Sequence, residues 1–260
     1  MIEALTKCLN FKNKKQKMKI LIIYAYFLLS INSYSQKQIY TGEINYEVNM
    51  LVNESKLDSI AKKIKGSENM KKMIISNMKN QKSINFKLKF SKNESIFEEE
   101  KRLKINEKKI NFTRIMMGNG SYYTNKKTKE TLNQKEAYGQ LFIVDVSQVE
   151  WELTQERKKI DSYVCYKATT FKEVENSKGK NKVEVIAWYT TELPYNFGPN
   201  EFNGLPGLIL ELQEGNLIIK ASKINLMNKN VEIKKPSKGK KITLEEFNIL
   251  SKKMYENRKN

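Results

Sequence analysis

The stretch that decides the fold is residues 187–212, AWYTTELPYNFGPNEFNGLPGLILEL, which holds three of the four prolines and three of the eleven glycines. An apolar, aromatic run over residues 183–190 leads into it and is typical of a β-strand. A second apolar run at 208–212 predicts a strand that is buried on both faces. Proline and glycine restrict the chain between the two runs, so we expect a rigid loop there.

Turn signals divide this stretch further. Residues 198–199 are a Gly-Pro turn dipeptide. The GLPG sequence at residues 204–207 carries a type II turn signal, with Pro206 at the second turn position and Gly207 at the third, where it would supply the positive φ. Gly215 predicts a tight hairpin from the second strand to a return strand. The predicted order is strand, rigid loop and hairpin.

The hexapeptide at residues 204–209 reads GLPGLI, and AWYT at 187–190, Pro194 and Gly-Pro at 198–199 precede it. On these residues the chain resembles the GLPGLI family, which consists of secreted proteins of the Bacteroidota. The resemblance extends to Trp151, the YVCYKA strand and Phe171, although the residue before Tyr163 is not the expected glycine. It implies an exported β-rich domain and brings no established activity with it.

Two interpretations of the loop at residues 193–208 stay open. It is either a structural plug that caps one end of the core or a binding loop presented by a rigid sheet. In the second case the candidate contact residues are the two aromatics before the loop and its prolines, glycines and one leucine: Trp188, Tyr189, Pro194, Gly198, Pro199, Gly204, Leu205, Pro206 and Gly207.

We expect residues 1–35 to be an N-terminal extension and signal peptide that lie outside the fold. The apolar run at 20–31 has the length of a signal-peptide core and is too short for a membrane span. Small serines just before Gln36 predict cleavage there, which would export the chain to the periplasm or to the outer-membrane or extracellular side. An uncleaved anchor is the rival interpretation, and the translation start, Met1 or Met18, stays open.

Residues 36–260 are predicted to form a single domain of the GLPGLI type. Residues 84–90 alternate apolar and polar side chains, which is the pattern of a half-buried strand. Further short strands are expected at residues 39–52, 95–97, 110–117, 121–124, 141–146, 151–156 and 163–170. Asn119 and Gly120 form a strong hairpin signal.

Two helical segments are also expected. Residues 56–79 carry apolar side chains at helical spacing, with a break at Gly66 and a methionine stripe that we interpret as a core face. An adaptable binding face is the alternative interpretation of that stripe. Thr243 and Glu246 form a capping box that opens a C-terminal helix. The predicted fold is mainly β (α+β), a single twisted or half-open antiparallel sheet with both helices on one face.

The net charge of +19 comes mainly from lysine. Proteins that read nucleic acids favour arginine for its bidentate contacts, and no nucleic-acid motif accompanies the charge. We therefore expect no nucleic-acid partner. Weak attraction to anionic lipid or polysaccharide at an envelope surface is expected, so peripheral membrane association stays open.

The chain has no histidine, and Cys165 is its one cysteine after residue 35. This inventory excludes Ser-His-Asp and Cys-His catalysis, histidine-ligated metals and thiolate zinc sites. We expect no metal and no cofactor, and we interpret Cys165 as a small buried hydrophobe. Catalysis by a pair of glutamates or by a lysine acting alone stays open with these residue types.

These residues favour an exported, non-catalytic cell-envelope protein that binds an apolar ligand, a peptide or an envelope partner through the loop and the curved sheet. One alternative is a glutamate-dependent hydrolase, which needs two carboxyl groups that face one cleft. The other alternative is a structural accessory of an outer-membrane assembly.

Overall fold

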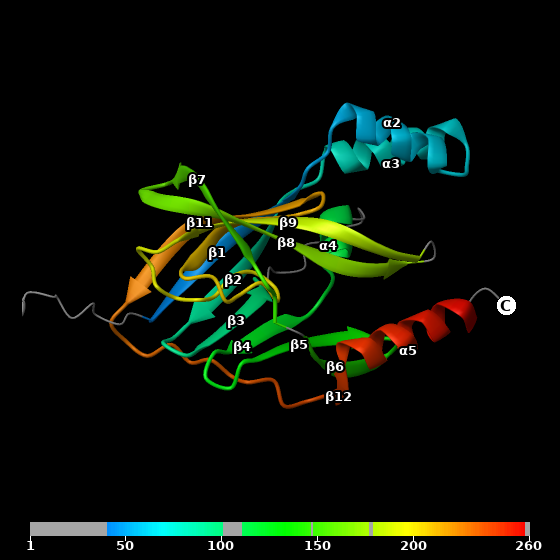
Figure 1. Cartoon of the computed structure of the whole chain (residues 1–260). Helices are drawn as coiled ribbons and strands as arrows, with labels where there is room; N and C mark the ends of the chain where they lie inside the picture. Colours follow the sequence, from blue (N-terminus) through cyan, green and yellow to red (C-terminus); the bar gives the residue numbers. More distant parts are fainter. Residues whose placement is uncertain (1–40, 101–110, 147, 177–178, 258–260) are drawn as a thin grey trace, which may run out of the picture. The chain divides into compact units, whose positions relative to one another are not determined.

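Twelve strands lie in the part of the chain that the computed structural model describes, residues 41–100, 111–146, 148–176 and 179–257 (Figure 1). They are β1 (Thr41–Met50), β2 (Ile84–Phe90), β3 (Glu94–Glu99), β4 (Ser121–Asn125), β5 (Glu130–Ala137), β6 (Gln140–Asp145), β7 (Glu152–Ile160), β8 (Tyr163–Asn176), β9 (Gly179–Thr190), β10 (Leu208–Glu214), β11 (Leu217–Met227) and β12 (Lys240–Thr243). The predicted extension and signal peptide at 1–35 lie outside the described residues.

All twelve strands belong to one open sheet in the order β12-β6-β5-β4-β3-β2-β1-β11-β10-β9-β8-β7. Every neighbouring pair is antiparallel except β12 with β6, which is parallel. The predicted mainly β fold with a single open antiparallel sheet is confirmed. The parallel edge pair was not predicted, because no strand was expected at residues 240–243.

Strand β1 joins the two halves of the sheet, because it pairs with β2 on one side and with β11 on the other. Its alternation predicts one buried face, and Ile44, Tyr46 and Val48 are indeed fully buried. The main hydrophobic core lies on this face, which we call the inner face. The predicted apolar strand β10 is also confirmed, since Leu208 to Leu212 are all buried.

The predicted type II turn at residues 204–207 is wrong. Gly204 has a positive φ of 92°, whereas Gly207 has no positive φ and therefore cannot be the third residue of that turn. Gly207 is needed for a different reason. A Cβ atom added to it would lie 2.0 Å from the backbone oxygen of Thr190.

The predicted strand at residues 110–117 is also wrong, because Phe112–Met117 form helix α4. The side chain of Asn111 caps this helix by accepting a hydrogen bond from the backbone N–H of Arg114. Gly120 consequently lies between α4 and β4 and does not connect two strands. Short apolar runs fit strand and helix equally well, so the cap is what decides between them.

The early helical segment is two helices, α2 (Glu54–Lys63) and α3 (Glu68–Lys79), with Gly66 between them at a φ of 146°. The predicted break is confirmed, but the predicted core face is wrong for α3, which has no buried residue. Met70 and Met73 are 40% and 59% exposed. The two helices pack mainly on each other.

The C-terminal helix α5 (Leu244–Asn257) begins with the predicted capping box. The backbone N–H of Glu246 donates to Thr243 Oγ1 at 3.2 Å, and the backbone N–H of Thr243 donates to the Glu246 carboxylate at 2.8 Å. Helix α5 packs on β12 and β6, where Phe247 meets Phe142 edge to face at 5.5 Å. It therefore covers one end of the sheet.

We predict that Gly207→Ala destabilises the protein by about 2–3 kcal/mol, because the new methyl group meets backbone that cannot rotate away. Urea denaturation followed by circular dichroism measures the change. Pro206→Ala is the matched control, since Pro206 is exposed. Equal stabilities of the two variants would contradict the close approach.

Candidate functional site

The loop between β9 and β10, residues 191–207, is folded back on itself. The backbone N–H groups of Leu208 and Gly204 donate to the carbonyls of Leu193 and Asn196, both at 3.0 Å. The side-chain amide of Asn196 donates to the carbonyl of Leu205 at 2.6 Å. Residues 193–196 therefore run beside residues 204–208, and the loop has a fixed internal structure.

The loop fills the inner face of the sheet. Its inward side chains belong to the main core and are Leu193, Tyr195, Phe197, Phe202 and Leu205. The ring of Tyr195 lies 4.6 Å from that of Phe90 on β2. The Trp151 indole N–H donates to the Asn203 carbonyl at 2.8 Å, which ties the loop to the start of β7. These contacts give the loop the role of a core plug, the first of the two interpretations.

The nine predicted contact residues do not form one surface. The exposed members are Pro194, Gly204 and Pro206. The buried members are Tyr189, Gly198, Pro199, Leu205 and Gly207. Trp188 is half-buried, and as the neighbour of Tyr189 in a strand it points to the opposite face. The Lys158 ammonium lies 4.3 Å from the centre of the Trp188 ring.

The three exposed members do come together, and we call them the loop ridge: Pro194, Gly204 and Pro206. The backbone hydrogen bonds that join Leu193 to Leu208 and Asn196 to Gly204 place the two arms of the loop side by side. A proline and a glycine on one arm therefore lie next to a proline on the other. The plug interpretation and the binding-loop interpretation apply to opposite sides of one loop.

An ion-paired cluster beneath the loop was not predicted from the sequence. The Lys172 ammonium on β8 lies 2.7 Å from a carboxylate oxygen of Glu201 in the loop and 2.7 Å from one of Glu214 on β10. The glutamate side chains are only 12% and 16% exposed. Burial would lower the pKa of Lys172, but the two carboxylates outweigh burial and raise it.

Two residues from the other half of the sheet complete this inner charge cluster, which comprises Lys172, Glu201, Glu214, Tyr122 and Lys135. Burial raises the pKa of Tyr122, and the charges of the two glutamates raise it further. Burial lowers the pKa of Lys135, against the attraction of Glu201. Because β4 and β5 are far from β8 in the strand order, the cluster bridges the two halves of the curved sheet.

Three buried side-chain oxygens near this cluster accept no hydrogen bond from the described residues: Glu201 Oε2, Asn200 Oδ1 and Asn133 Oδ1. Asn133 is the cross-strand partner of Tyr122, and the neighbouring Thr131 hydroxyl accepts from the Asn203 amide at 3.1 Å. The loop therefore lies over β5 at this point. Acceptors of this kind suit ordered water or the hydroxyl and amino groups of a ligand.

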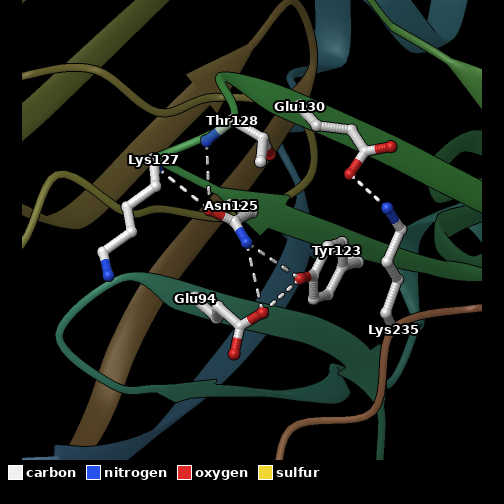
Figure 2. A network of polar contacts seen from close by, with 7 residues as sticks. All are labelled: Glu94, Tyr123, Asn125, Lys127, Thr128, Glu130 and Lys235. Carbon is white, nitrogen blue, oxygen red and sulfur yellow. Dashed lines mark hydrogen bonds and ion pairs between the residues drawn. The ribbon is translucent and has the colours of Figure 1, made fainter.

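A second polar network lies at the turn between β4 and β5 (Figure 2). Asn125 Oδ1 accepts from the backbone N–H groups of Lys127 and Thr128 at 2.9 and 3.3 Å, which closes the turn. The Tyr123 hydroxyl donates to the carboxylate of Glu94 on β3. Burial and this contact raise the pKa of Tyr123 to about 12.

The same network anchors the chain after β11. Lys235 Nζ lies 2.5 Å from a carboxylate oxygen of Glu130 (Figure 2). Each hydrogen bond or ion pair drawn in Figure 2 lies within one strand, joins neighbouring strands, closes the turn or holds the segment after β11. We therefore assign it a structural role and keep the loop ridge and the inner charge cluster as the candidate site.

The described residues contain no group of three or more acidic, histidine or cysteine side chains placed to hold a metal ion. The predicted burial of Cys165 is confirmed, since its side chain is fully buried. Burial raises the pKa of its thiol to about 11, which keeps it protonated and unreactive near neutral pH.

Residues 175–211 match the model of a family described as "Protein of unknown function (Porph_ging)". The match contains all of β9 and the loop, and it includes the GLPGLI hexapeptide. It supports a relation to an uncharacterised protein family. The narrower resemblance to the GLPGLI family stays a prediction.

The chain is also similar to two solved structures, described as "Structure of PNGF-II in C2 space group" and "Structure of PNGF-II in P21 space group". Each shares 18% sequence identity with this chain, and each match covers 81% of this chain, with TM-scores of 0.49 and 0.48. The matches cover 32% and 33% of those chains, so this chain spans about one third of their length. No curated protein matches the sequence.

We predict that Lys172→Met destabilises the protein by about 2–3 kcal/mol at pH 7, because two half-buried carboxylates lose their shared cation. The expected loss in the free energy of unfolding is below the ~3–5 kcal/mol typical of breaking a fully buried ion pair, since the Lys172 side chain is 31% exposed. Denaturant unfolding measures it, with Lys180→Met on the exposed hairpin as the control.

The pH dependence of this effect has a definite sign. The raised pKa of Lys172 means that its contribution is fully present below about pH 10 and is lost as the pH rises through the raised value. A stability difference between variant and parent that stays constant as the pH rises from about 10 through the raised pKa of Lys172 would contradict the ion-pair assignment.

Proposed function

We propose that the protein is an exported, non-catalytic binding module of the cell envelope that holds a peptide or protein partner on the loop ridge. The observation that carries this proposal is the two-sided loop: its inner side is packed into the core while Pro194, Gly204 and Pro206 face solvent. A surface that is already rigid loses little conformational entropy on binding, which favours affinity.

The packed interior favours a partner on the surface over an apolar ligand inside the sheet. Binding sites for small apolar molecules are concave and need unoccupied volume. In this protein the aromatic side chains of Tyr195, Phe197 and Phe202 take up the inner face of the sheet. A carrier function would require the loop to leave, which would expose these rings and break the contacts of Glu201 with Lys172.

Site-specific photocrosslinking tests this proposal. A photoreactive amino acid at Pro206 should give a discrete crosslinked protein in the native cell envelope, because the ridge is the proposed contact surface. The same amino acid at Lys229, which is also exposed, serves as the control position. Crosslinking of the same proteins with equal yield at both positions would exclude the ridge as a specific binding surface.

A hydrolase is a second candidate, because the structure brings two carboxylates together. The Glu201 and Glu214 oxygens are both 2.7 Å from Lys172 Nζ, so they lie within twice that distance of each other. This upper limit is compatible with the carboxyl separation of about 5–5.5 Å in a retaining glycoside mechanism. Against it, the lysine occupies the position between the two carboxylates.

For this candidate we predict that Glu201→Gln and Glu214→Gln each abolish hydrolysis of envelope polysaccharide, while Glu192→Gln, in the same loop, leaves it intact. Release of reducing sugar by purified protein is the measurement. If the unmodified protein releases none, the pair is an ion pair only and the hydrolase candidate fails.

A further inference from the structure

Packing against the core does not account for the surface of the helical hairpin formed by α2 and α3. The two helices run antiparallel, because Lys79 at the end of α3 pairs with Glu54 at the start of α2 at 2.9 Å. At the opposite end, the side chain of Met70 lies against Gly66 in the turn. Helix α3 has no buried residue, and both Met70 and Met73 are exposed.

This hairpin is also strongly basic. Residues 54–79 contain seven lysines and three acidic residues, which leaves a net charge of +4. Two of the acidic residues, Glu54 and Glu68, are already paired with lysines of the hairpin. The further lysines Lys62, Lys63 and Lys72 are exposed. Exposed methionine beside unneutralised lysine therefore defines the hairpin surface.

We propose that the α2–α3 hairpin docks on an anionic lipid surface. An exposed apolar side with lysines beside it is the pattern of helices that lie in a membrane interface, where apolar side chains enter the acyl boundary and lysines reach the headgroups. The helices of 10 and 12 residues lie on such a surface, since no helix among the described residues is long and apolar enough to cross a membrane.

The charge of the hairpin favours an anionic lipid surface over a second copy of the chain as its docking partner. Two copies that met through the hairpin would bring two surfaces of charge +4 together, and like charges across an interface oppose association. An anionic bilayer offers the opposite charge and an apolar layer directly beneath it, which matches both features of the hairpin. Docking through the hairpin is independent of the loop ridge.

Vesicle sedimentation tests the proposal. The protein from Gln36 onward is used, because residues 1–35 are themselves basic and apolar and would bind lipid. It should sediment with vesicles of about one third phosphatidylglycerol in phosphatidylcholine, and about tenfold less with pure phosphatidylcholine. Salt at about 1 M, where the screening length falls to about 3 Å, should release it. Equal sedimentation with both vesicles would overturn the proposal.

Charge-reversal variants locate the contact. Lys63→Glu with Lys72→Glu should lower the partition onto anionic vesicles about tenfold or more, because the contact itself changes sign. Lys229→Glu with Lys238→Glu makes the same change in net charge elsewhere on the surface and should have a much smaller effect. Equal losses in the two variants would show attraction by total charge alone and would overturn the assignment to the hairpin.

A separate variant tests the contribution of the apolar side chains to lipid binding. Met70→Ser with Met73→Ser keeps every charge and should still weaken binding to anionic vesicles several-fold, because the apolar surface is lost. Phe171→Ser with Ile249→Ser removes exposed apolar side chains elsewhere and is the control. Circular dichroism confirms folding, which these exposed positions should leave unchanged.

Two further outcomes separate this inference from its rivals. Retention by immobilised polyglutamate that depends on Lys63 and Lys72, without vesicle binding, would assign the hairpin to an acidic protein and overturn the lipid proposal. Photocrosslinking at Pro206 should remain in the hairpin variants. Loss of vesicle binding with crosslinking retained, or the reverse, shows which of the two proposals fails.

Discussion

The buried hydrogen bond from the Tyr46 hydroxyl to the Ile209 carbonyl, 2.5 Å long, joins the strand that organises the sheet to the strand that follows the loop. Tyr46 lies on β1, between the two halves of the sheet, and its side chain is fully buried. Burial raises the pKa of its hydroxyl, so the group stays a neutral donor. The end of the loop is thereby fixed against the inner face, and the core packing of the loop depends on that position.

The same inner face explains which parts of the fold the sequence could predict. The alternation at Ile44, Tyr46 and Val48 indicates which side chains are buried, so the strands and the open sheet could be predicted from the sequence. The parallel edge strand β12 was not, because its four residues are mostly lysine and threonine and exposed. Its position comes from pairing with β6, which no local pattern encodes.

Gly207 shows the limit of local interpretation within the predicted site. The GLPG sequence fits a turn template through φ alone, whereas the actual constraint is the backbone of Thr190, 17 residues earlier. Likewise, Lys172, Glu201 and Glu214 come from three separate elements. One signal was available: Ala168 is buried on β8, and period two places Lys172 on the same inner face. A lysine in that register requires a buried acidic partner.

The ion pairs of Lys172 therefore have a role beyond their energy. Apolar contacts of Phe197 and Phe202 favour burial of the loop but tolerate small shifts along the sheet, because hydrophobic burial is not directional. Two half-buried carboxylates that share one ammonium have few satisfactory arrangements, and any shift leaves a charge unpaired. We infer that the core holds the loop in place and the cluster sets its register. The geometry of the loop ridge, on the outer side of the loop, therefore depends on that register.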